Sequence, residues 1–587
     1  MKAYISELVK ESLQVIDPVE AEAVLGSGVF DVSYPKPGFG DYATNAAMVL
    51  FKKFNTAPAK SPMEFATALA EKISELDKEN TFAKIEAVAG FVNFTLSQEV
   101  LAGLVTANQN EIEFISEDGK IGEGKKVVFE YSSPNTNKAL HIGHVRNDVY
   151  GKACINLLKA VGYKVLTCEI INDRGIHIMK SILMYKKYGE GKTPETTGLK
   201  SDHFVGKFYA MFGVKAAESE ETEKILLEEA QELLRRWESG DEEVRKVWKQ
   251  MNEWFFEGAK LTYLREGTTF DEVDFESEIY DKGRDLVLAG VEKGIFQKEE
   301  DGSISLDLEN EKLGKKYLLR QDGTTLYMTQ DMYLWDQRNN RHQPDMAFVT
   351  TATEQAYHFQ VLQHVFRLLD YPWANNFKHL PYEHVYLGKN KMSSRSGNSI
   401  TADELYDSVK TRVRETMSSL EKLKGSAEDD MLVEKVALGA VKYGYLHYEP
   451  QTRIYFDIDT TISLEGNTGP YIQYAYARIQ SILRKVDVNG ADVKPVDLDS
   501  PEELQLMRTI IKYESVVATA AREYKPNLLC SYLLELASNL NSFYANVSVS
   551  KEENKNIQTQ RISLLITTAN VLKNGLSLLG IDAPEEM

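Results

Sequence analysis

The sequence of 587 residues is too long for one hydrophobic core, and its length predicts roughly three to five domains. Apolar residues make up 43 % of the chain and charged residues 27 %, the balance of a folded, soluble protein. No run approaches the roughly 18 apolar residues of a membrane span, so we expect no membrane contact. The net charge of −20 argues against sequence-independent wrapping of nucleic acid but leaves a localised RNA site open.

The amino terminus and the cysteines both favour the cytoplasm. The segment MKAYISELVKESLQ lacks the apolar core of a secretory signal. Cys154, Cys168 and Cys530 lie singly in apolar stretches, so neither a zinc knuckle nor a disulfide framework is implied. We therefore expect buried thiols, a cytoplasmic location and no tightly bound metal.

Residues 1–108 are predicted to form a small α/β unit. A leading helix is followed by the turn-rich SYPKPGFGDYATN, by helical stretches and by strand-like alternation in KIEAVAGFVNFTL. The polar, glycine-containing segment that comes next reads as a linker, so we expect the second domain to begin near residue 120.

A strand, a helix and a second strand then follow in close order. The apolar run 127–132 is a predicted strand, helical periodicity continues to Gly162, and KVLTCEII (164–171) is a predicted buried strand. Such a βαβ unit builds a parallel sheet that binds ligands at the carboxyl ends of its strands. The polar clusters SSPNTNKALHIGH and NDRG (172–175) both lie at that edge.

The rest of the chain alternates between helical and extended stretches. Residues 186–306 are charged and mostly helical, which is typical of an insertion with a solvated face. Strand-like segments return in YLLRQDGTTLYMT, DMAFVTTATEQ and near HVYLG, and they end in the loop GKNKMSSRSGNSI. From Ala402 onward the pattern is helical apart from an extended RIYFDIDTTI.

Two loops can carry chemistry. His141 and His144 open a helix, where unpaired N–H groups and the helix dipole favour an anion, and Gly143 permits close backbone approach. We favour phosphate contact over a structural role for these histidines. By itself the basic loop around Lys391 is better explained as an exposed turn, but a lysine there can neutralise a leaving pyrophosphate, and the two loops together are far more specific.

The sequence HIGH (141–144) and the KMSSR loop (391–395) resemble the paired motifs of class I aminoacyl-tRNA synthetases. The sequence around these motifs is similar to that of the arginyl-tRNA synthetase family over nearly the whole chain. The matching segments are FGDYATN (39–45), EAVAGFVNF (86–94), EYSSPN (130–135), DGTTLY (322–327), EGNT (465–468) and PYIQYAYAR (470–478).

The resemblance implies an α/β fold: a Rossmann-type parallel-sheet catalytic domain with a small α/β N-terminal domain and an all-α C-terminal anticodon-binding domain. The implied domains are an elbow-binding unit at 1–108, a catalytic domain at 120–400, a connecting helical region at 401–468 and the helical domain at 469–587. It implies ATP with Mg²⁺, L-arginine and arginine tRNA as substrates, and a monomer by family habit. Arginine would be activated to an adenylate and then transferred to the terminal adenosine of the tRNA, with release of pyrophosphate and AMP.

A pocket for arginine needs carboxylates, because a guanidinium has five donors and no acceptor. Glu130 and Asp331 can supply them, and Tyr327 shares a helix face with Asp331. Core packing is an equally good explanation of Tyr327 at this stage. By resemblance, the arginine-binding residues are Glu130, Ser132, Asn135, Tyr327, Asp331 and Gln355.

The ATP side departs from the wider class at one position. Ser394 stands where a lysine is expected, and Lys138, three residues before His141, is placed to restore the charge. By resemblance, the catalytic residues are Lys138, His141, His144 and Lys391, and ATP is bound by His141, Gly143, His144, Lys391, Met392 and Ser393.

The tRNA contacts are carried over in the same way. The predicted contacts are Phe39, Asp41, Tyr42 and Asn45 in the N-terminal unit and Tyr474, Tyr532, Asn539 and Tyr544 in the helical domain. About half of such helical aromatics are expected to be core residues. Two rivals remain at this stage: a small-molecule nucleotidyl transferase and a catalytically silent tRNA-binding relative.

Overall fold

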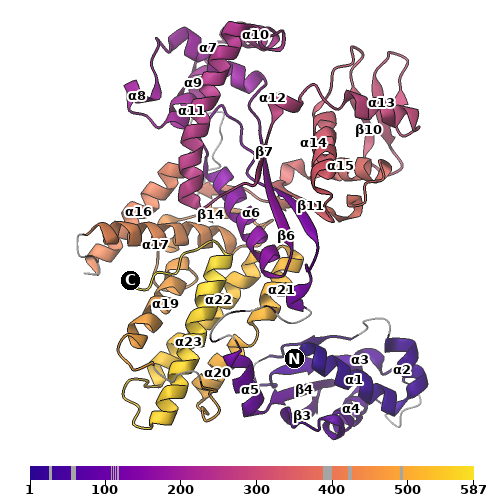
Figure 1. The fold of residues 1–587 in the computed structure, drawn as a ribbon, viewed down its shortest axis with the longest axis vertical. Coiled ribbons are helices and arrows are strands. Elements are labelled where there is room, and N and C mark those ends of the chain that lie inside the picture. Colours follow the sequence, from indigo (N-terminus) through magenta and orange to yellow (C-terminus); the bar gives the residue numbers. More distant parts are fainter. Residues whose placement is uncertain are drawn as a thin grey trace. The chain divides into compact units, whose positions relative to one another are not determined.

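The computed structural model divides the chain into two compact units (Figure 1). One contains Met1–Glu117, Arg478–Glu514 and Glu535–Asn574, and the other contains Asp118–Ala477, Ser515–Leu534 and Gly575–Met587. The structure describes residues 1–25, 30–36, 38–54, 61–107, 109, 112, 114, 118–387, 400–420, 423, 426–488 and 493–587. The C-terminal helices contribute to both units. The separate domain that the sequence predicts from residue 469 stays a prediction.

The unit that begins at Asp118 is built on a parallel sheet with strand order β12-β11-β5-β6-β7. Its strands are β5 (Lys126–Glu130), β6 (Lys164–Ile171), β7 (Glu272–Phe275), β11 (Met346–Ala352) and β12 (Phe377–Tyr382). The predicted βαβ unit is confirmed, because β5 leads through α6 (Ile142–Ala160) to its parallel neighbour β6. The next strand in the sheet on the other side of β5 is β11, so the order reverses at β5 and its carboxyl end is a topological switch point.

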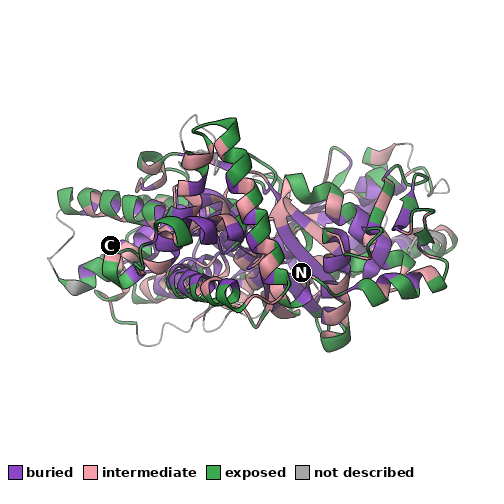
Figure 2. Ribbon diagram, turned by 90° about the horizontal axis from the view of Figure 1, so that it is seen from above, coloured by how far each residue is buried: buried purple, intermediate pink, exposed green. Residues whose placement is uncertain are grey.

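Burial on both faces explains why β5 is so apolar. Val128 packs into a cluster with Trp335 of α14 (Tyr327–His342), and Phe129 packs into a second cluster with Tyr150 of α6. A strand covered on both sides reads as a continuous apolar run rather than an alternating one. Figure 2 shows buried residues concentrated on strands and inner helix faces.

The chain between β6 and α14, which includes the predicted insertion 186–306, forms a helical bundle, then β7 of the parallel sheet, and then a small antiparallel sheet (Figure 1). Its main helices are α7 (Ile176–Tyr188), α9 (Ser201–Ala216), α10 (Glu220–Glu238) and α11 (Glu242–Glu266), and the sheet contains β8 (Gln297–Lys298), β9 (Ile304–Leu308) and β10 (Gly314–Leu319). The expected strand YLLRQDGTTLYMT is only partly correct, because β10 ends at Leu319 and α14 begins at Tyr327. Gly323, at φ +81°, turns the chain between them.

Further helices and a short strand pair complete this part of the unit. The elements are α15 (Ala356–Leu368), β13 (Val385–Leu387), α16 (Ala402–Ser419), α17 (Ala427–Leu446), β14 (Ile454–Phe456) and α18 (Ile458–Thr461). The extended RIYFDIDTTI is likewise half right: β14 pairs in parallel with β13, but α18 follows at once.

The other unit contains a four-stranded antiparallel sheet, β1-β2-β4-β3, covered by helices. Its elements include α1 (Lys2–Ile16), β1 (Val32–Ser33), β2 (Tyr42–Thr44), α4 (Pro62–Leu76), β3 (Phe82–Val88), β4 (Phe91–Leu96), α5 (Gln98–Thr106) and α20 (Pro501–Ile510). The predicted alternation in KIEAVAGFVNFTL is a hairpin of β3 and β4 that turns at Gly90. Among the residues that the structure describes, no helix is both long and apolar enough to cross a membrane.

The close packing of α9 on α11 gives a stability prediction. A Cβ atom added at Gly258 of α11 would lie 2.5 Å from the Asp202 backbone nitrogen. Gly258→Ala is therefore expected to lower the free energy of unfolding by about 1–3 kcal/mol, because overpacking outweighs alanine's better helix propensity. Gly103→Ala in α5, where only a lysine end lies 4.0 Å away, is the control and is expected to be neutral or stabilising in urea denaturation.

Candidate active site

The two histidines of the HIGH motif share one hydrogen-bonded cap at the start of α6. Gly143 N–H donates to His141 Nδ1 at 3.1 Å, and His141 N–H donates to His144 Nδ1 at 3.0 Å. Their rings stack with centroids 3.9 Å apart. Because each Nδ1 accepts a backbone N–H, each neutral ring carries its proton on Nε2 as a donor.

Burial keeps both rings uncharged. Burial, together with the nearby Lys138 charge, lowers the pKa of His141 to about 3. Burial also lowers the pKa of His144 well below its usual value, with His141 and Lys138 acting in the same direction. At neutral pH the motif therefore offers two Nε2–H donors at the positive end of the α6 dipole, which suits a phosphate oxygen.

Lys138 is a half-buried cation next to this cap. Burial lowers its pKa, and within the described part of the chain its ammonium has no hydrogen-bond or ion-pair partner. The backbone behind it is fixed by α9, since a Cβ at Gly206 would lie 3.3 Å from Ala139 N and 3.4 Å from Lys138 Cα. An anion in front of Lys138 would stabilise the charge that burial penalises.

The second predicted loop falls on residues 388–399, so Lys391, Met392 and Ser393 lie outside the described residues. The chain that follows directly meets the HIGH loop. Ala402 N–H donates to the Leu140 carbonyl at 2.8 Å, and Ile142 N–H donates to the Ile400 carbonyl at 3.3 Å. His141 and Thr401 thus form an antiparallel bridge, which brings the flanks of the two motifs together.

Glu130, at the end of β5, already has a guanidinium partner from the protein itself. Its carboxylate is hydrogen-bonded to fully buried Arg338 of α14, whose Nε also donates to Asp274 Oδ2 at 3.0 Å. Burial raises the pKa of Glu130 although Arg338 opposes the rise. Glu130 is therefore tied to Arg338 in this structure, and sequence reasoning did not identify that partner.

Asp331, Tyr327 and Gln355 remain accessible around the same strand ends. Asp331 Oδ2 lies 2.5 Å from His358 Nε2, and Gln355 is exposed. Tyr327 is 77 % exposed, which rules out the alternative that it packs in the core. Tyr327 and Asp331 both lie in the first turns of α14, as their spacing predicts.

Glu276 is a candidate that the sequence did not single out. It begins α12 (Glu276–Ile279) directly after β7 and is buried. Burial raises its pKa to about 7, Arg174 lowers it, and the Asp173 and Asp331 charges raise it. Its place at the carboxyl end of a parallel strand was the available signal, but the charge-rich sequence around it looked like solvated surface.

The loop between β5 and α6 holds an unusual backbone. Ser132 and Ser133 both have positive φ, +67° and +54°, a region that non-glycine residues rarely adopt. Asn147 Nδ2 donates to the Ser132 carbonyl at 3.3 Å, and the Ser132 hydroxyl lies 2.8 Å from the Tyr263 hydroxyl. Asn135 is exposed, and its backbone bridges Asn172 of the next polar cluster.

Three of the predicted RNA contacts lie in the protein interior. Asp41 accepts from Leu96 N–H at 2.7 Å and from Arg508 Nε at 2.6 Å. Tyr42 is buried against the Tyr34 ring. The rest differ in exposure: Tyr532 is buried, Asn45, Tyr474 and Asn539 are half-buried, and Phe39 and Tyr544 are exposed. Burial argues against direct RNA contact by Asp41, Tyr42 and Tyr532.

Family models match three successive parts of the chain. Residues 3–96 match the arginyl tRNA synthetase N terminal domain, 111–458 match the class I (R) tRNA synthetase catalytic domain, and 472–587 match the DALR anticodon binding domain. A solved arginyl-tRNA synthetase from Thermus thermophilus has the same fold, with a TM-score of 0.84, 24 % identity and full coverage of both chains. One from Plasmodium falciparum gives a TM-score of 0.81 at 21 % identity, covering 100 % of this chain and 99 % of that one.

Curated relatives are closer in sequence. An arginine–tRNA ligase from Porphyromonas gingivalis is 38 % identical, covering 93 % of this chain and 94 % of the relative, and one from Bacteroides thetaiotaomicron is 38 % identical with the same coverage. The parallel sheet and the helix that opens with HIGH therefore define a class I aminoacyl-tRNA synthetase. Within that class the chain belongs to the arginyl-tRNA synthetase family and is an arginine–tRNA ligase.

The low pKa of His141 predicts an acid-dependent loss of stability. Unfolding returns the imidazole to about 6.5, so its contribution is complete above that pH and is lost as the pH falls towards 3. His141→Asn keeps a capping acceptor and is expected to flatten the fall between pH 6 and 4 by up to about 1.4 kcal/mol per pH unit. Urea denaturation at each pH measures the slope. An unchanged slope would contradict a neutral, half-buried His141, and His177→Asn at an exposed position is the control.

Proposed function

We propose that the chain activates arginine and charges tRNA at the carboxyl ends of β5, β6 and β11. A carboxylate oxygen of arginine attacks the α-phosphorus of ATP in line, and the bond to pyrophosphate breaks. A ribose hydroxyl of the terminal adenosine, the 2′ one, then attacks the adenylate carbonyl, which releases AMP. Neither step needs a protein nucleophile, so catalysis depends on alignment and on stabilising charge at the transferring phosphate.

The observation that carries the proposal is the neutral histidine pair at the start of α6. His141 and His144 would donate Nε2–H bonds to ATP phosphate oxygens, and Gly143 would allow close backbone approach. Lys138 would supply the positive charge that Ser394 does not. Lys391, Met392 and Ser393 would also contact the phosphates. Mg²⁺ would arrive with ATP and retain most of its waters.

On the arginine side, the half-buried Asp331 and the buried Glu276 would hold the substrate guanidinium. Asp331 and Glu276 lie close enough for their charges to interact, and a guanidinium between them would relieve that repulsion. Glu130, Ser132, Asn135, Tyr327 and Gln355 complete the proposed pocket. Glu130 would act through its pair with Arg338 or exchange partners when arginine enters.

The tRNA would lie along exposed and half-buried polar and aromatic side chains. We retain Phe39, Asn45, Tyr474, Asn539 and Tyr544 as contacts, whereas Asp41, Tyr42 and Tyr532 would support the surfaces beside them. The chain would act as a cytoplasmic monomer, and light scattering after gel filtration tests the oligomeric state.

Pyrophosphate exchange tests the function directly. Each amino acid is supplied in turn with ATP, with and without arginine tRNA. Exchange is expected with arginine alone among them, and we expect it to need the tRNA. Exchange that ignores tRNA and accepts other small carboxylates would favour a nucleotidyl transferase. No exchange under any condition would favour a silent tRNA binder and would sink the proposal.

Lys138→Ala tests the charge assigned to the phosphate loop. Loss of an ammonium that stabilises leaving pyrophosphate is expected to lower the arginine-activation rate by at least about tenfold, with partial recovery in Lys138→Arg. Lys152→Ala, a lysine further along α6, is the matched control. A rate for Lys138→Ala within about threefold of wild type, less than roughly 0.7 kcal/mol of barrier, would remove Lys138 from the mechanism.

A further inference from the structure

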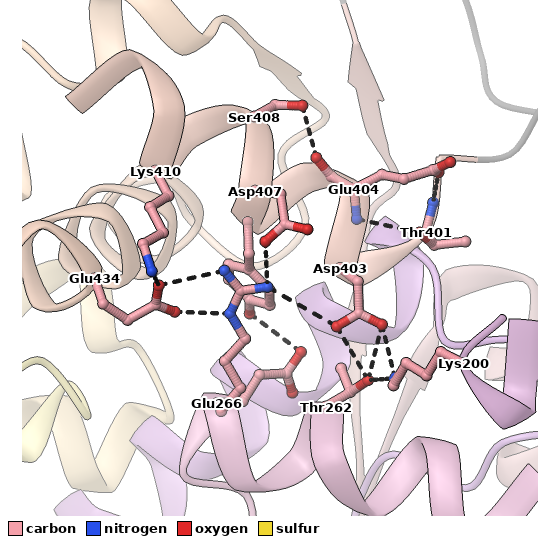
Figure 3. A network of polar contacts seen from close by, with 12 residues as sticks. Lys200, Thr262, Glu266, Thr401, Asp403, Glu404, Asp407, Ser408, Lys410 and Glu434 are labelled. Atoms are coloured by element: carbon pink, nitrogen blue, oxygen red, sulfur yellow. Dashed lines mark hydrogen bonds and ion pairs between the residues drawn. The ribbon is translucent and has the colours of Figure 1, made fainter. Parts of the chain in front are cut away.

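The first turn of α16 is clamped to the helical insertion by one carboxylate (Figure 3). Asp403 Oδ2 lies 2.7 Å from Nζ of Lys200, the N-cap of α9, and 3.1 Å from Nε2 of His203 in the first turn of α9. The Thr262 hydroxyl of α11 donates to the same carboxylate at 3.3 Å. The Asp403 side chain is only 18 % exposed, so these partners take the place of water.

A second set of ion pairs continues the contact along α16. Arg265 of α11 pairs with Asp407 at 2.8 Å and with Glu434 of α17 at 2.7 Å. Lys410 also reaches Glu434, at 3.0 Å. Arg265 also lies 3.9 Å from Asp403, so the two sets form one network (Figure 3), and α16 is held against α11 and α17 over more than one turn.

The Asp403 cluster is a structural ion network and not a metal site. Ligand atoms of Asp202, His203 and Asp403 lie within 4.8 Å of one another, a grouping that can hold a cation. The Lys200 ammonium already lies 3.2 Å from Asp202 and 2.7 Å from Asp403, so the lysine supplies that positive charge. Although burial raises the pKa of Asp403, hydrogen bonds from His203 and Lys200 hold it well below its usual range.

The clamp adjoins the catalytic loop through a single stretch of backbone. Ala402, immediately before Asp403, donates to the Leu140 carbonyl, and Thr401 bridges His141. Thr401 is also the N-cap of α16, with Glu404 N–H donating to its hydroxyl at 3.2 Å and Thr401 N–H donating to the Glu404 carboxylate at 2.8 Å. The start of α16 therefore has little freedom to move without carrying the HIGH backbone with it.

We propose that Asp403 is a positioning residue for arginine activation, which fixes the Thr401–His141 backbone bridge by clamping the start of α16 to Lys200, His203 and Thr262. The proposal rests on the phosphate-binding role of His141 and His144 put forward above. Asp403 touches no reactant. A shift of about 1 Å in a positioned catalytic group can lower a rate about 100-fold, so a distant clamp can control the chemical step.

Asp403→Asn tests the clamp in the full-length protein. The change removes the charge that holds Lys200 and His203 and keeps the side-chain shape. The rate of arginine-dependent pyrophosphate exchange with tRNA present is expected to fall about tenfold or more, with the KM for arginine within about twofold. Asp407→Asn, on the same helix and paired only with Arg265 among these cations, is the matched control and is expected to stay within about twofold of wild type.

Two further measurements separate positioning from general destabilisation. Hydrogen exchange in peptides covering 139–147 is expected to speed up in Asp403→Asn and to be unchanged in Asp407→Asn. Lys200→Met removes the Lys200–Asp403 ion pair from the side of Lys200 and replaces Asp403→Asn as the test variant if that protein does not fold. It is expected to slow activation in the same direction, and the double variant is expected to lose little more than either single change, because both remove one interaction.

The proposal is overturned if Asp403→Asn and Lys200→Met slow activation no more than Asp407→Asn does. It is also overturned if activation slows while exchange at 139–147 stays at the wild-type rate. His144→Ala is measured in parallel. A wild-type rate for His144→Ala would instead refute the phosphate-binding role of the motif, whereas a slow His144→Ala beside a normal Asp403→Asn refutes only the positioning.

Discussion

The start of α6 is the point on which the catalytic unit depends, because it is fixed from three directions. The loop that leads into α6 begins at the carboxyl end of β5. Thr401 forms a backbone bridge with His141, and Gly206 of α9 packs against the loop at Lys138 and Ala139. At this position the Nδ1 atoms of both histidines accept backbone N–H groups of the helix cap, which leaves each Nε2–H as the donor for a ligand. A phosphate would therefore be recognised by neutral donors, because the burial that holds the rings in place also disfavours their protonated form.

Charge in this unit is balanced locally although the whole chain is strongly acidic. Arg338 neutralises Glu130 and Asp274 inside the fold, and Lys200 does the same for Asp202 and Asp403. Two charges that burial disfavours lie near the strand ends: Lys138 on one side and Glu276, which Arg174 only partly offsets, on the other. The positive charge of Lys138 is complementary to the phosphates of ATP, and the negative charge of Glu276 is complementary to the guanidinium of arginine.

Much of this arrangement could be predicted from the sequence, and what could not shares one physical cause. The β5–α6–β6 unit was predicted correctly because local apolar runs and helical spacing in the sequence determine it. Arg338, Glu276 and Asp403 act through partners that are remote along the chain, and each looks locally like a solvated surface charge. Exposure is equally hidden, since Tyr532 and Tyr544 lie on one helix yet only Tyr544 faces solvent.

The contact of Gly206 with the loop has a consequence for how this chain can be shortened. The insertion looks like a lobe that a minimal enzyme might omit. Its helix α9 forms the wall behind Ala139, and Lys200, just before this helix, binds Asp403 of α16. A protein shortened by residues 201–266 would keep the HIGH motif in its sequence and β7 in its sheet, yet it would lose the surface against which the loop before α6 packs.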